Sequence, residues 1–261
     1  MNYYAGIDIE STYIKCLILD NELNILAKAK QKSGIDIKSL TKSLFEQCLF
    51  EANIPSQVIS TIVLTGKGRR IINGEFKAYN IKSVPEIISI SKGVSYLIAN
   101  NKGKIIIDIG GEKWKAIKTD EKGNSLEFES NSLCAASTGK FLDFISKNLD
   151  MSIEEMTDKA MHYDKIININ QLCGILVESA IISALSNGEK PENVFTSLFY
   201  NMFMDFCKKP IIEKNVTDEI YLTGGVSANA FLKILFERKY KNVYVLDNPE
   251  YVCAYGAISY S

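Results

Sequence analysis

The stretch YYAGIDIESTYIKCLILD, residues 3–20, decides the fold because it predicts two strands joined by a polar loop. Apolar and β-branched residues favour strands over residues 3–10 and 13–20. A third strand is predicted over ILAKAKQ, residues 25–31, beyond the turn region at Asp20-Asn21-Glu22. Strands joined by such short turns pair antiparallel, so the chain is expected to begin with an antiparallel meander.

The elements after this meander repeat its outline. Apolar residues at helical spacing over residues 37–54, followed by a short apolar run over 60–66, predict a helix, a strand and hence a parallel crossover. Further elements are a helix over 84–99 and strands over 102–111, 114–120 and 125–130, with a turn from Asp120 to Asn124. The likeness lies in the order of elements and not in residue identity, and it predicts two duplicated α/β lobes.

The boundary between the lobes is expected near Ala99 to Lys104, where Asn-Asn-Lys-Gly breaks the pattern. We therefore expect an N-terminal lobe of residues 1–99 and a C-terminal lobe of residues 100–261. The last helix is expected to return to the hinge. No low-complexity linker separates the lobes, which predicts a shared cleft between them.

Composition excludes several classes of function. The chain has 30 Lys plus Arg against 31 Asp plus Glu, so no global positive field favours nucleic acid or an anionic membrane as partner. Neither a charged leader nor a bilayer-length apolar run is present, and a cytoplasmic protein is expected. Its six cysteines include no C-x-x-C pair, which argues against a zinc knuckle, and its single histidine, His162, is expected on a surface helix.

Two loops after predicted strands carry candidate phosphate chemistry. In the first, Asp8 ends a strand, and Ser11, Thr12 and Lys15 follow it. Such a group can hold hydrated Mg²⁺ and present backbone N–H groups to phosphate oxygens. In the second, Asp108 ends a strand and Gly110-Gly111 lets the backbone approach a phosphate closely.

A third segment, residues 222–229, ends a strand and opens a helix, as a nucleoside-binding turn would. Its candidate cofactor-binding residues are Gly224, Gly225 and Asn229. Each of the three loops taken alone is equally compatible with a simple strand terminator. Together and in this order, they resemble the phosphate-one, phosphate-two and adenosine motifs of the actin, heat-shock-chaperone and sugar-kinase superfamily. This resemblance implies a two-lobed, actin-like (ribonuclease H-like) ATPase fold, in which Tyr255-Gly256-Ala257-Ile258 is similar to a connecting helix whose small residues let two helices cross.

Two cysteines, Cys134 and Cys173, each precede a predicted helix. A helix N-terminus favours thiolate and would stabilise an anionic iron–sulfur cluster. Cysteines this far apart are also common as buried core residues. A four-iron cluster usually takes four thiolates, so one chain would supply half the set and a two-fold symmetric dimer would complete it.

The segment from Asn131 to Asp143, NSLCAASTGKFLD, resembles the signature N-x-x-C-A-A-G-T-G-x-F-L-D of the ATP-dependent activases of 2-hydroxyacyl-CoA dehydratases and the ATPase subunits of benzoyl-CoA reductase. The segment from Cys173 to Ser179, CGILVES, is similar to their second motif, C-x-x-F-x-E-S. Thr65-Gly66-Lys67-Gly68-Arg69 resembles their T-G-x-G-R loop, and Pro249-Glu250-Tyr251 precedes the last helix as in that family.

The resemblance implies an oxygen-sensitive homodimer with ATP/ADP and Mg²⁺ in each cleft and one [4Fe-4S] cluster between the subunits. Cys134 and Cys173 of both copies would be the metal ligands. ATP hydrolysis would drive one low-potential electron to a partner dehydratase or reductase, with a reduced ferredoxin or flavodoxin as donor.

Four residues depart from the family pattern: Glu10, Glu112, Ser137 and Leu176. Asp8, Asp108 and Glu112 are the candidate catalytic residues. Glu112 is either a general base for water or a solvated carboxylate beside Lys113 and Lys115.

Several other residues are expected to be structural. Trp114 is expected to pack within a strand, and the basic residues Lys67, Arg69 and Arg70 either meet phosphate or an acidic partner surface or are simply solvated. Core thiols are expected at Cys16, Cys48, Cys207 and Cys253. Two rival functions remain: a sugar or acid kinase of the same fold, and a nucleotide-binding paralogue that does not hydrolyse ATP.

Overall fold

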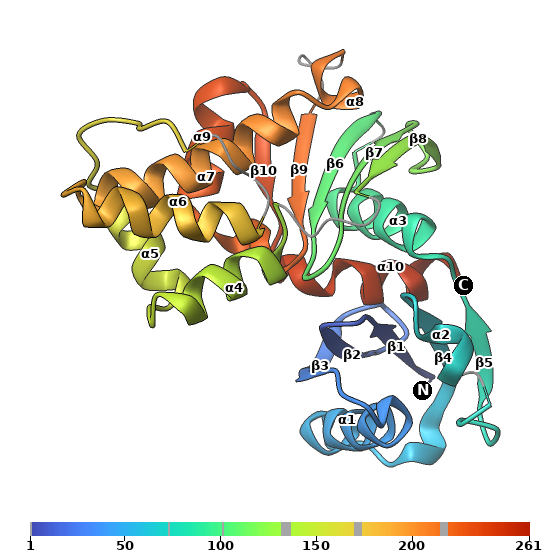
Figure 1. Cartoon of the computed structure of the whole chain (residues 1–261). Helices are drawn as coiled ribbons and strands as arrows, with labels where there is room; N and C mark the ends of the chain where they lie inside the picture. Colours follow the sequence, from blue (N-terminus) through green and yellow to red (C-terminus); the bar gives the residue numbers. More distant parts are fainter. Residues whose placement is uncertain (1, 73, 101, 132–136, 170–173, 215–218) are drawn as a thin grey trace. The chain divides into compact units, whose positions relative to one another are not determined.

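The computed structural model describes residues 2–72, 74–100, 102–131, 137–169, 174–214 and 219–261. It divides into two compact units (Figure 1). Unit 1 comprises Met1–Gly103, Thr119–Leu126 and Glu250–Ser261. Unit 2 comprises Lys104–Lys118 and Glu127–Pro249.

Unit 1 contains a five-stranded sheet in the order β3-β2-β1-β4-β5. Its strands are β1 (Tyr3–Ile9), β2 (Tyr13–Leu19), β3 (Ile25–Lys32), β4 (Ile59–Thr65) and β5 (Asn80–Ser83). The first three form the predicted antiparallel meander, and β4 pairs parallel with β1. Helix α1 (Ile37–Ala52) lies between β3 and β4 in the chain, so the predicted crossover is confirmed. Two short elements, η1 (Ser56–Val58) and α2 (Arg69–Ile72), flank β4 in the sequence.

The alternation of side chains along these strands builds two apolar layers. Ile7 and Cys16 face the layer that α1 covers with Leu44 and Phe45. On the opposite side, Leu17 packs with residues of α10 (Val252–Tyr260). Helices α3 (Glu86–Ile98) and α10 contact each other, as the small residues Gly256 and Ala257 predict.

The crossing of these two helices requires glycine at one position. A Cβ atom at Gly256 would lie 1.8 Å from the Ser89 carbonyl oxygen and 2.4 Å from the Gly93 nitrogen. No side chain can be accommodated at such distances, so Gly256 brings the α10 backbone against α3. This contact places Ser89 of α3 and Cys253 of α10 near the end of β4.

Unit 2 repeats the sheet of unit 1. Its strands are β6 (Lys104–Ile109), β7 (Trp114–Thr119), β8 (Ser125–Ser130), β9 (Glu219–Thr223) and β10 (Val243–Val245). The order β10-β9-β6-β7-β8 contains the same antiparallel β6–β7 pair beside the same parallel β6–β9 pair. The predicted duplication of the fold is therefore confirmed at the level of strand order and direction.

Helices pack on one face of the second sheet. They are α4 (Gly139–Asn148), α5 (Ile153–Ala160), α6 (Gly174–Ser186), α7 (Pro191–Cys207), α8 (Pro210–Glu213) and α9 (Ala230–Lys239). Two 3₁₀ turns, η2 (Gly225–Ala228) and η3 (Pro249–Tyr251), complete the elements. The core joins Ile105 and Ile107 of β6 to aromatic residues such as Phe199 of α7 and Phe236 of α9. Within the residues that the structure describes, no helix is both long and apolar enough to cross a membrane.

Candidate functional site

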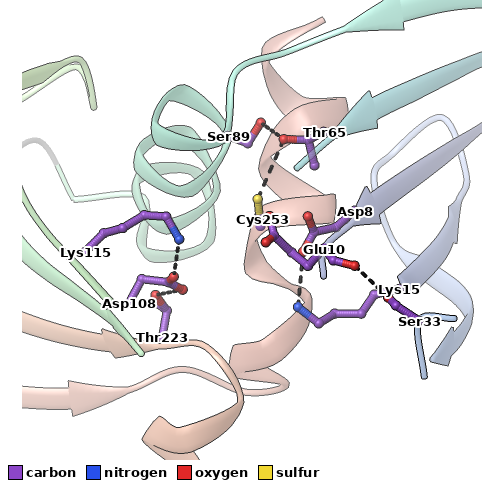
Figure 2. Close-up of polar contacts among 10 residues, drawn as sticks. All are labelled: Asp8, Glu10, Lys15, Ser33, Thr65, Ser89, Asp108, Lys115, Thr223 and Cys253. Carbon is purple, nitrogen blue, oxygen red and sulfur yellow. Dashed lines mark hydrogen bonds and ion pairs between the residues drawn. The ribbon is translucent and has the colours of Figure 1, made fainter. Parts of the chain in front are cut away.

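In unit 1, the end of β1 positions a buried carboxylate. Asp8 is 2% exposed and lies opposite Lys15 in the β1–β2 pair, and Lys15 Nζ is 3.1 Å from Asp8 Oδ2 (Figure 2). The other oxygen, Oδ1, is buried and accepts no hydrogen bond. Buried carboxylate oxygens nearly always have a donor or a cation. Asp8 Oδ1 is therefore suited to bind Mg²⁺ or one of the water ligands of Mg²⁺.

The loop after β1 is tied down by its neighbours. The backbone N–H of Glu10 donates to the carbonyl oxygen of Tyr13 at 3.1 Å, and Ser33 Oγ donates to the carbonyl oxygen of Glu10 at 2.6 Å. Ser11 is exposed at the tip, and Thr12 Oγ1 is buried without a hydrogen-bond partner. The loop after β1 thus contains a buried hydroxyl without a protein hydrogen-bond partner.

The loop after β4 packs against the end of β1. Gly66 has φ +80°, and a Cβ atom there would lie 2.5 Å from the Ile9 carbonyl oxygen and 2.7 Å from Asp8 Oδ1. Arg69 Nη1 donates to the Gly66 carbonyl oxygen at 2.9 Å, so this side chain supports the loop backbone and is not simply solvated. Lys67 and Arg70 are exposed.

In unit 2, the end of β6 positions the corresponding carboxylate. Asp108 lies opposite Lys115 in the β6–β7 pair, and Lys115 Nζ is 3.2 Å from Asp108 Oδ2 (Figure 2). Thr223 Oγ1 donates to Asp108 Oδ1 at 3.0 Å. Both oxygens of Asp108 therefore have protein partners, whereas Asp8 has a partner on Oδ2 only.

The Gly110-Gly111 loop is hydrogen bonded to the first turn of α4. Gly139 N donates to the Gly110 carbonyl oxygen at 3.0 Å, and Lys140 N donates to the Gly111 carbonyl oxygen at 2.6 Å. In a planar trans peptide, C=O and N–H point in opposite directions. The N–H groups of Gly111 and Glu112 consequently point away from α4, which is the orientation that phosphate binding requires.

Glu112 forms an ion pair that the sequence did not indicate. Its Oε1 lies 3.0 Å from Lys140 Nζ, with the two side chains 34% and 42% exposed. Of the two lysines near Glu112 in the sequence, Lys115 forms an ion pair with Asp108. The Glu112–Lys140 ion pair became possible only because the Gly110-Gly111 loop contacts the start of α4.

The adenosine-type turn follows β9. Gly224 has φ +85°, and a Cβ atom there would lie 2.5 Å from the Ile109 carbonyl oxygen. Asn229 caps α9, because its Oδ1 accepts from Leu232 N at 3.0 Å, and its Nδ2 donates to Thr157 Oγ1 at 2.6 Å. Asn229 thus joins the turn to α5 with both amide atoms.

A cavity of about 440 Å³ opens between this turn and α4 and α5. Its apolar wall includes Leu142, Ile153 and Val226, and the acidic side chains Glu154 and Asp158 also line it. Small-molecule sites usually measure roughly 300–1,000 Å³ and combine apolar walls with a few polar groups. The size and lining of the cavity therefore suit a nucleoside, and two of the candidate cofactor-binding residues, Gly225 and Asn229, line it.

The two hairpins share identical residues at equivalent positions, which corrects the expectation that only the order of elements is repeated. Identical residues recur at a constant offset of one hundred positions: Ile7, Asp8, Ile9, Lys15, Asp20 and Asn24 correspond to Ile107, Asp108, Ile109, Lys115, Asp120 and Asn124. The contacts recur as well, since Asp20 Oδ1 accepts from Asn24 N at 2.9 Å and Asp120 Oδ1 accepts from Asn124 N at 2.7 Å. This offset was readable in the sequence and would have identified the two half-sites directly.

The equivalent positions of two threonines, Thr65 and Thr223, were not predicted from the sequence. Thr65 pairs with Asp8 across β4 and β1, and Thr223 pairs with Asp108 across β9 and β6. Each is followed by a glycine with positive φ, at Gly66 and Gly224. The shared Thr-Gly dipeptide after each inner strand was the available signal.

The expectations for the remaining residues have mixed outcomes. Cys134 and Cys173 lie outside the described residues. The four expected core thiols at Cys16, Cys48, Cys207 and Cys253 are buried, which confirms that prediction.

Trp114 packs edge-on against Phe206 with ring centroids 5.7 Å apart, as expected for strand packing. His162 is exposed, although it lies in the turn after α5 and not within a helix.

Known proteins resemble this chain over its length. Residues 5–261 match the BadF/BadG/BcrA/BcrD ATPase family. The 2-hydroxyisocaproyl-CoA dehydratase activator of Clostridioides difficile is 29% identical over 99% of this chain and 94% of its own length. Among solved structures, component A of the Acidaminococcus fermentans (R)-2-hydroxyglutaryl-CoA dehydratase superposes with a TM-score of 0.88 at 25% identity, covering 100% of this chain and 98% of that one.

An activator of the 2-hydroxyisocaproyl-CoA dehydratase from Clostridium difficile with bound ADPNP gives a TM-score of 0.87 at 28% identity, covering 99% of this chain and 93% of that one. Sugar kinases of the ROK type, at 10–12% identity and TM-scores of 0.55 and 0.64, share the fold alone. The expected actin and sugar-kinase fold class is therefore confirmed.

Proposed function

The chain belongs to the BadF/BadG/BcrA/BcrD ATPase family, and we propose that its ATPase reaction drives a low-potential electron from a subunit-bridging iron–sulfur cluster to a partner enzyme. The proposed partner is a 2-hydroxyacyl-CoA dehydratase or a related reductase, because similar proteins are named as activators of such dehydratases or as a subunit of benzoyl-CoA reductase. A reduced ferredoxin or flavodoxin is the proposed electron donor.

We assign a proposed role in nucleotide chemistry to residues of each unit. In unit 1, Asp8 Oδ1 would accept from a water ligand of Mg²⁺, with Ser11 and Thr12 as neighbouring hydroxyls. In unit 2, the N–H groups of the Gly110-Gly111 loop would bind phosphate oxygens, and the cavity beside Asn229 would take the nucleoside. Glu112 is the proposed acceptor of the proton from the attacking water.

One observation supports a link between this phosphate loop and the cysteines. The N-terminal N–H groups of α4 donate to the loop carbonyl oxygens, and α4 and α6 contact each other. Cys134 lies shortly before α4, and Cys173 lies directly before α6. A movement of the loop on phosphate binding or release would therefore be transmitted to the two helices that follow the cysteines.

The proposed cluster ligands are Cys134 and Cys173 from each copy of a homodimer, since two thiolates per chain give the four that a four-iron cluster takes. When bound, such a cluster supplies a one-electron carrier of low potential. The residues of this chain would hold it, and the loop, α4 and α6 would change its surroundings with the nucleotide state.

Anaerobic purification followed by iron and sulfide analysis tests this proposal. We expect about four irons per dimer, a spin-resonance signal after reduction that changes with ATP, and loss of iron in Cys134→Ala and Cys173→Ala. Cys207→Ala removes a buried thiol of α7 and is the matched control that should keep its iron. Iron-free protein, or iron retained in Cys134→Ala, would remove the cluster. Nucleotide binding without phosphate release would instead favour a non-hydrolysing paralogue, and phosphate transfer to an added sugar or acid would favour a kinase.

A further inference from the structure

We propose that Ser89 and Cys253 are positioning residues that turn the Thr65 hydroxyl away from Asp8 and so keep Asp8 Oδ1 available to the Mg²⁺-nucleotide. The inference rests on the proposed function, in which Asp8 interacts with that ligand. It assigns a role to a buried polar group at the contact of α3 and α10 that the proposed reaction does not otherwise use (Figure 2).

The strand register shows that Thr65 is placed to reach Asp8. Asp8 pairs with Thr65 in the parallel β1–β4 ladder, and Asp108 pairs with Thr223 in the parallel β6–β9 ladder. Residues paired in this way project from the same face of the sheet. In unit 2, the threonine at this register position does reach the carboxylate, since Thr223 Oγ1 lies 3.0 Å from Asp108 Oδ1.

In unit 1, the equivalent hydroxyl is engaged elsewhere. Thr65 Oγ1 lies 3.0 Å from Ser89 Oγ and 3.7 Å from Cys253 Sγ. Ser89 Oγ in turn donates to the Pro85 carbonyl oxygen at 3.2 Å. Thr65 and Ser89 are each 0% exposed, so no water competes for these contacts.

Counting protons fixes the direction of these hydrogen bonds. A hydroxyl group has one proton to donate, and Ser89 directs its proton to the Pro85 carbonyl oxygen. Thr65 must therefore be the donor in its contact with Ser89. An ionised carboxylate accepts but cannot donate, so a Thr65–Asp8 bond would need the same proton. As long as Ser89 holds that proton, Asp8 Oδ1 has no protein donor.

The two half-sites differ in consequence. Asp108 has a protein donor on each oxygen, from Lys115 and Thr223. Asp8 has Lys15 on Oδ2 only, which leaves Oδ1 for the ligand. The aspartate, the lysine opposite it and the threonine on the next strand are the same in both units, so we assign the difference to Ser89 and Cys253, which the α3–α10 contact brings to the end of β4.

The test measures Mg²⁺-dependent binding of a non-hydrolysable ATP analogue by calorimetry, which does not depend on turnover. Ser89→Ala removes the acceptor of the Thr65 proton and lets Thr65 donate to Asp8. We expect the Mg²⁺ concentration for half-maximal binding to rise about tenfold, the factor that one hydrogen bond to a charged group corresponds to. Thr65→Val alone should change it by less than about twofold, because that hydroxyl is already turned away from Asp8.

The deciding variant is Ser89→Ala combined with Thr65→Val. The double variant has no hydroxyl to donate to Asp8, so we expect it to recover the Mg²⁺ dependence of the wild type. If Ser89 and Thr65 only pack α3 against β4, the second substitution will add to the damage of the first, and that result would overturn the inference.

Two further arms keep the outcome unambiguous. Thermal unfolding of each variant shows whether it is folded, and if Ser89→Ala is not, Cys253→Ala tests the same contact from α10, with a smaller rise that Thr65→Val again removes. Wild-type protein that binds no nucleotide in the presence of Mg²⁺ refutes the proposed function. If the wild type binds nucleotide in a Mg²⁺-dependent way, and Ser89→Ala and Cys253→Ala have the same Mg²⁺ dependence, only the positioning role is refuted.

Discussion

Replacement of Lys115 by methionine should destabilise unit 2 by about 3 kcal/mol. The Asp108–Lys115 ion pair is buried, with the two side chains 11% and 6% exposed. Removing one partner of a buried pair costs about 3–5 kcal/mol, because the remaining charge is left uncompensated. The Thr223 hydroxyl still donates to Asp108 in the variant, which places the expected cost at the lower end of this range.

Urea unfolding followed by tryptophan fluorescence measures this cost in the correct unit. The chain has a single tryptophan, Trp114, which is 5% exposed and belongs to the core of unit 2. With an m-value of about 2 kcal/mol/M, a loss of about 3 kcal/mol lowers the urea midpoint by about 1.5 M. Lys113→Met, on the same hairpin but without a buried partner carboxylate, should shift the midpoint by no more than about 0.3 M.

A double substitution separates the lost charge pair from lost packing. Asp108→Asn combined with Lys115→Met removes both charges and keeps an oxygen that can accept from Thr223, so it should recover most of the stability lost in Lys115→Met. A double variant as unstable as Lys115→Met, or a single variant that loses less than about 1 kcal/mol, would show that the ion pair is not what stabilises this hairpin.

Three further predictions concern single positions. Gly224→Ala should lower the free energy of unfolding in urea by more than about 2 kcal/mol, because Gly224 has φ +85° and a Cβ atom there would lie 2.5 Å from a backbone oxygen. The control Gly225→Ala, whose Cβ atom would meet nothing within 4 Å, should lower it by less than about 0.5 kcal/mol. Equal costs would contradict the argument from backbone conformation. Glu112→Gln should lower kcat for ATP hydrolysis by about a hundredfold or more, since a general base contributes about 10²–10⁴-fold. The thermal midpoint should not change, because a partly exposed ion pair contributes at most about 1 kcal/mol to stability. An unchanged kcat would show that Glu112 is only the ion-pair partner of Lys140. Hydrogen bonds from Lys38 and Lys42 lower the pKa of Glu75 from 4.5 to about 2. The stability that this carboxylate contributes should therefore be present above pH 4.5 and be lost as the pH falls towards 2. The thermal midpoint of Glu75→Gln should differ from that of the wild type at pH 7 and equal it near pH 2.

Local patterns in the sequence predicted the strands, the helix between β3 and β4 and the glycine loops, because each of these depends on neighbouring residues. The meander, the crossover and the α3–α10 contact all lie where the alternation, the helical spacing and the Gly-Ala pair place them. The cross-strand pair of Asp8 and Lys15 was also within reach, since residues at equal distances from a hairpin loop face each other.

Contacts between distant segments could not be predicted in the same way. Glu112 and Lys140 meet only because the first turn of α4 donates to the Gly110-Gly111 carbonyl oxygens. Asn229, a candidate cofactor-binding residue, also caps α9 and reaches Thr157 on α5. Such pairings depend on which helix packs on which loop, and one sequence without its fold does not contain that information.

A duplicated fold produces two equal sites unless something outside the repeat makes them different. Here, the residues of the repeat are conserved between the two halves down to the aspartate, the lysine opposite it and the threonine on the next strand. The hydroxyl of that threonine has a single proton, and the two units direct it to different acceptors. In unit 2, the threonine donates its hydrogen bond to the aspartate. In unit 1, a serine on α3 accepts this hydrogen bond, and one carboxylate oxygen of the aspartate has no protein donor. Ser89→Ala would therefore let both aspartates accept a hydrogen bond from their threonine, and this is why a substitution that removes one buried oxygen atom is expected to change how the protein binds Mg²⁺.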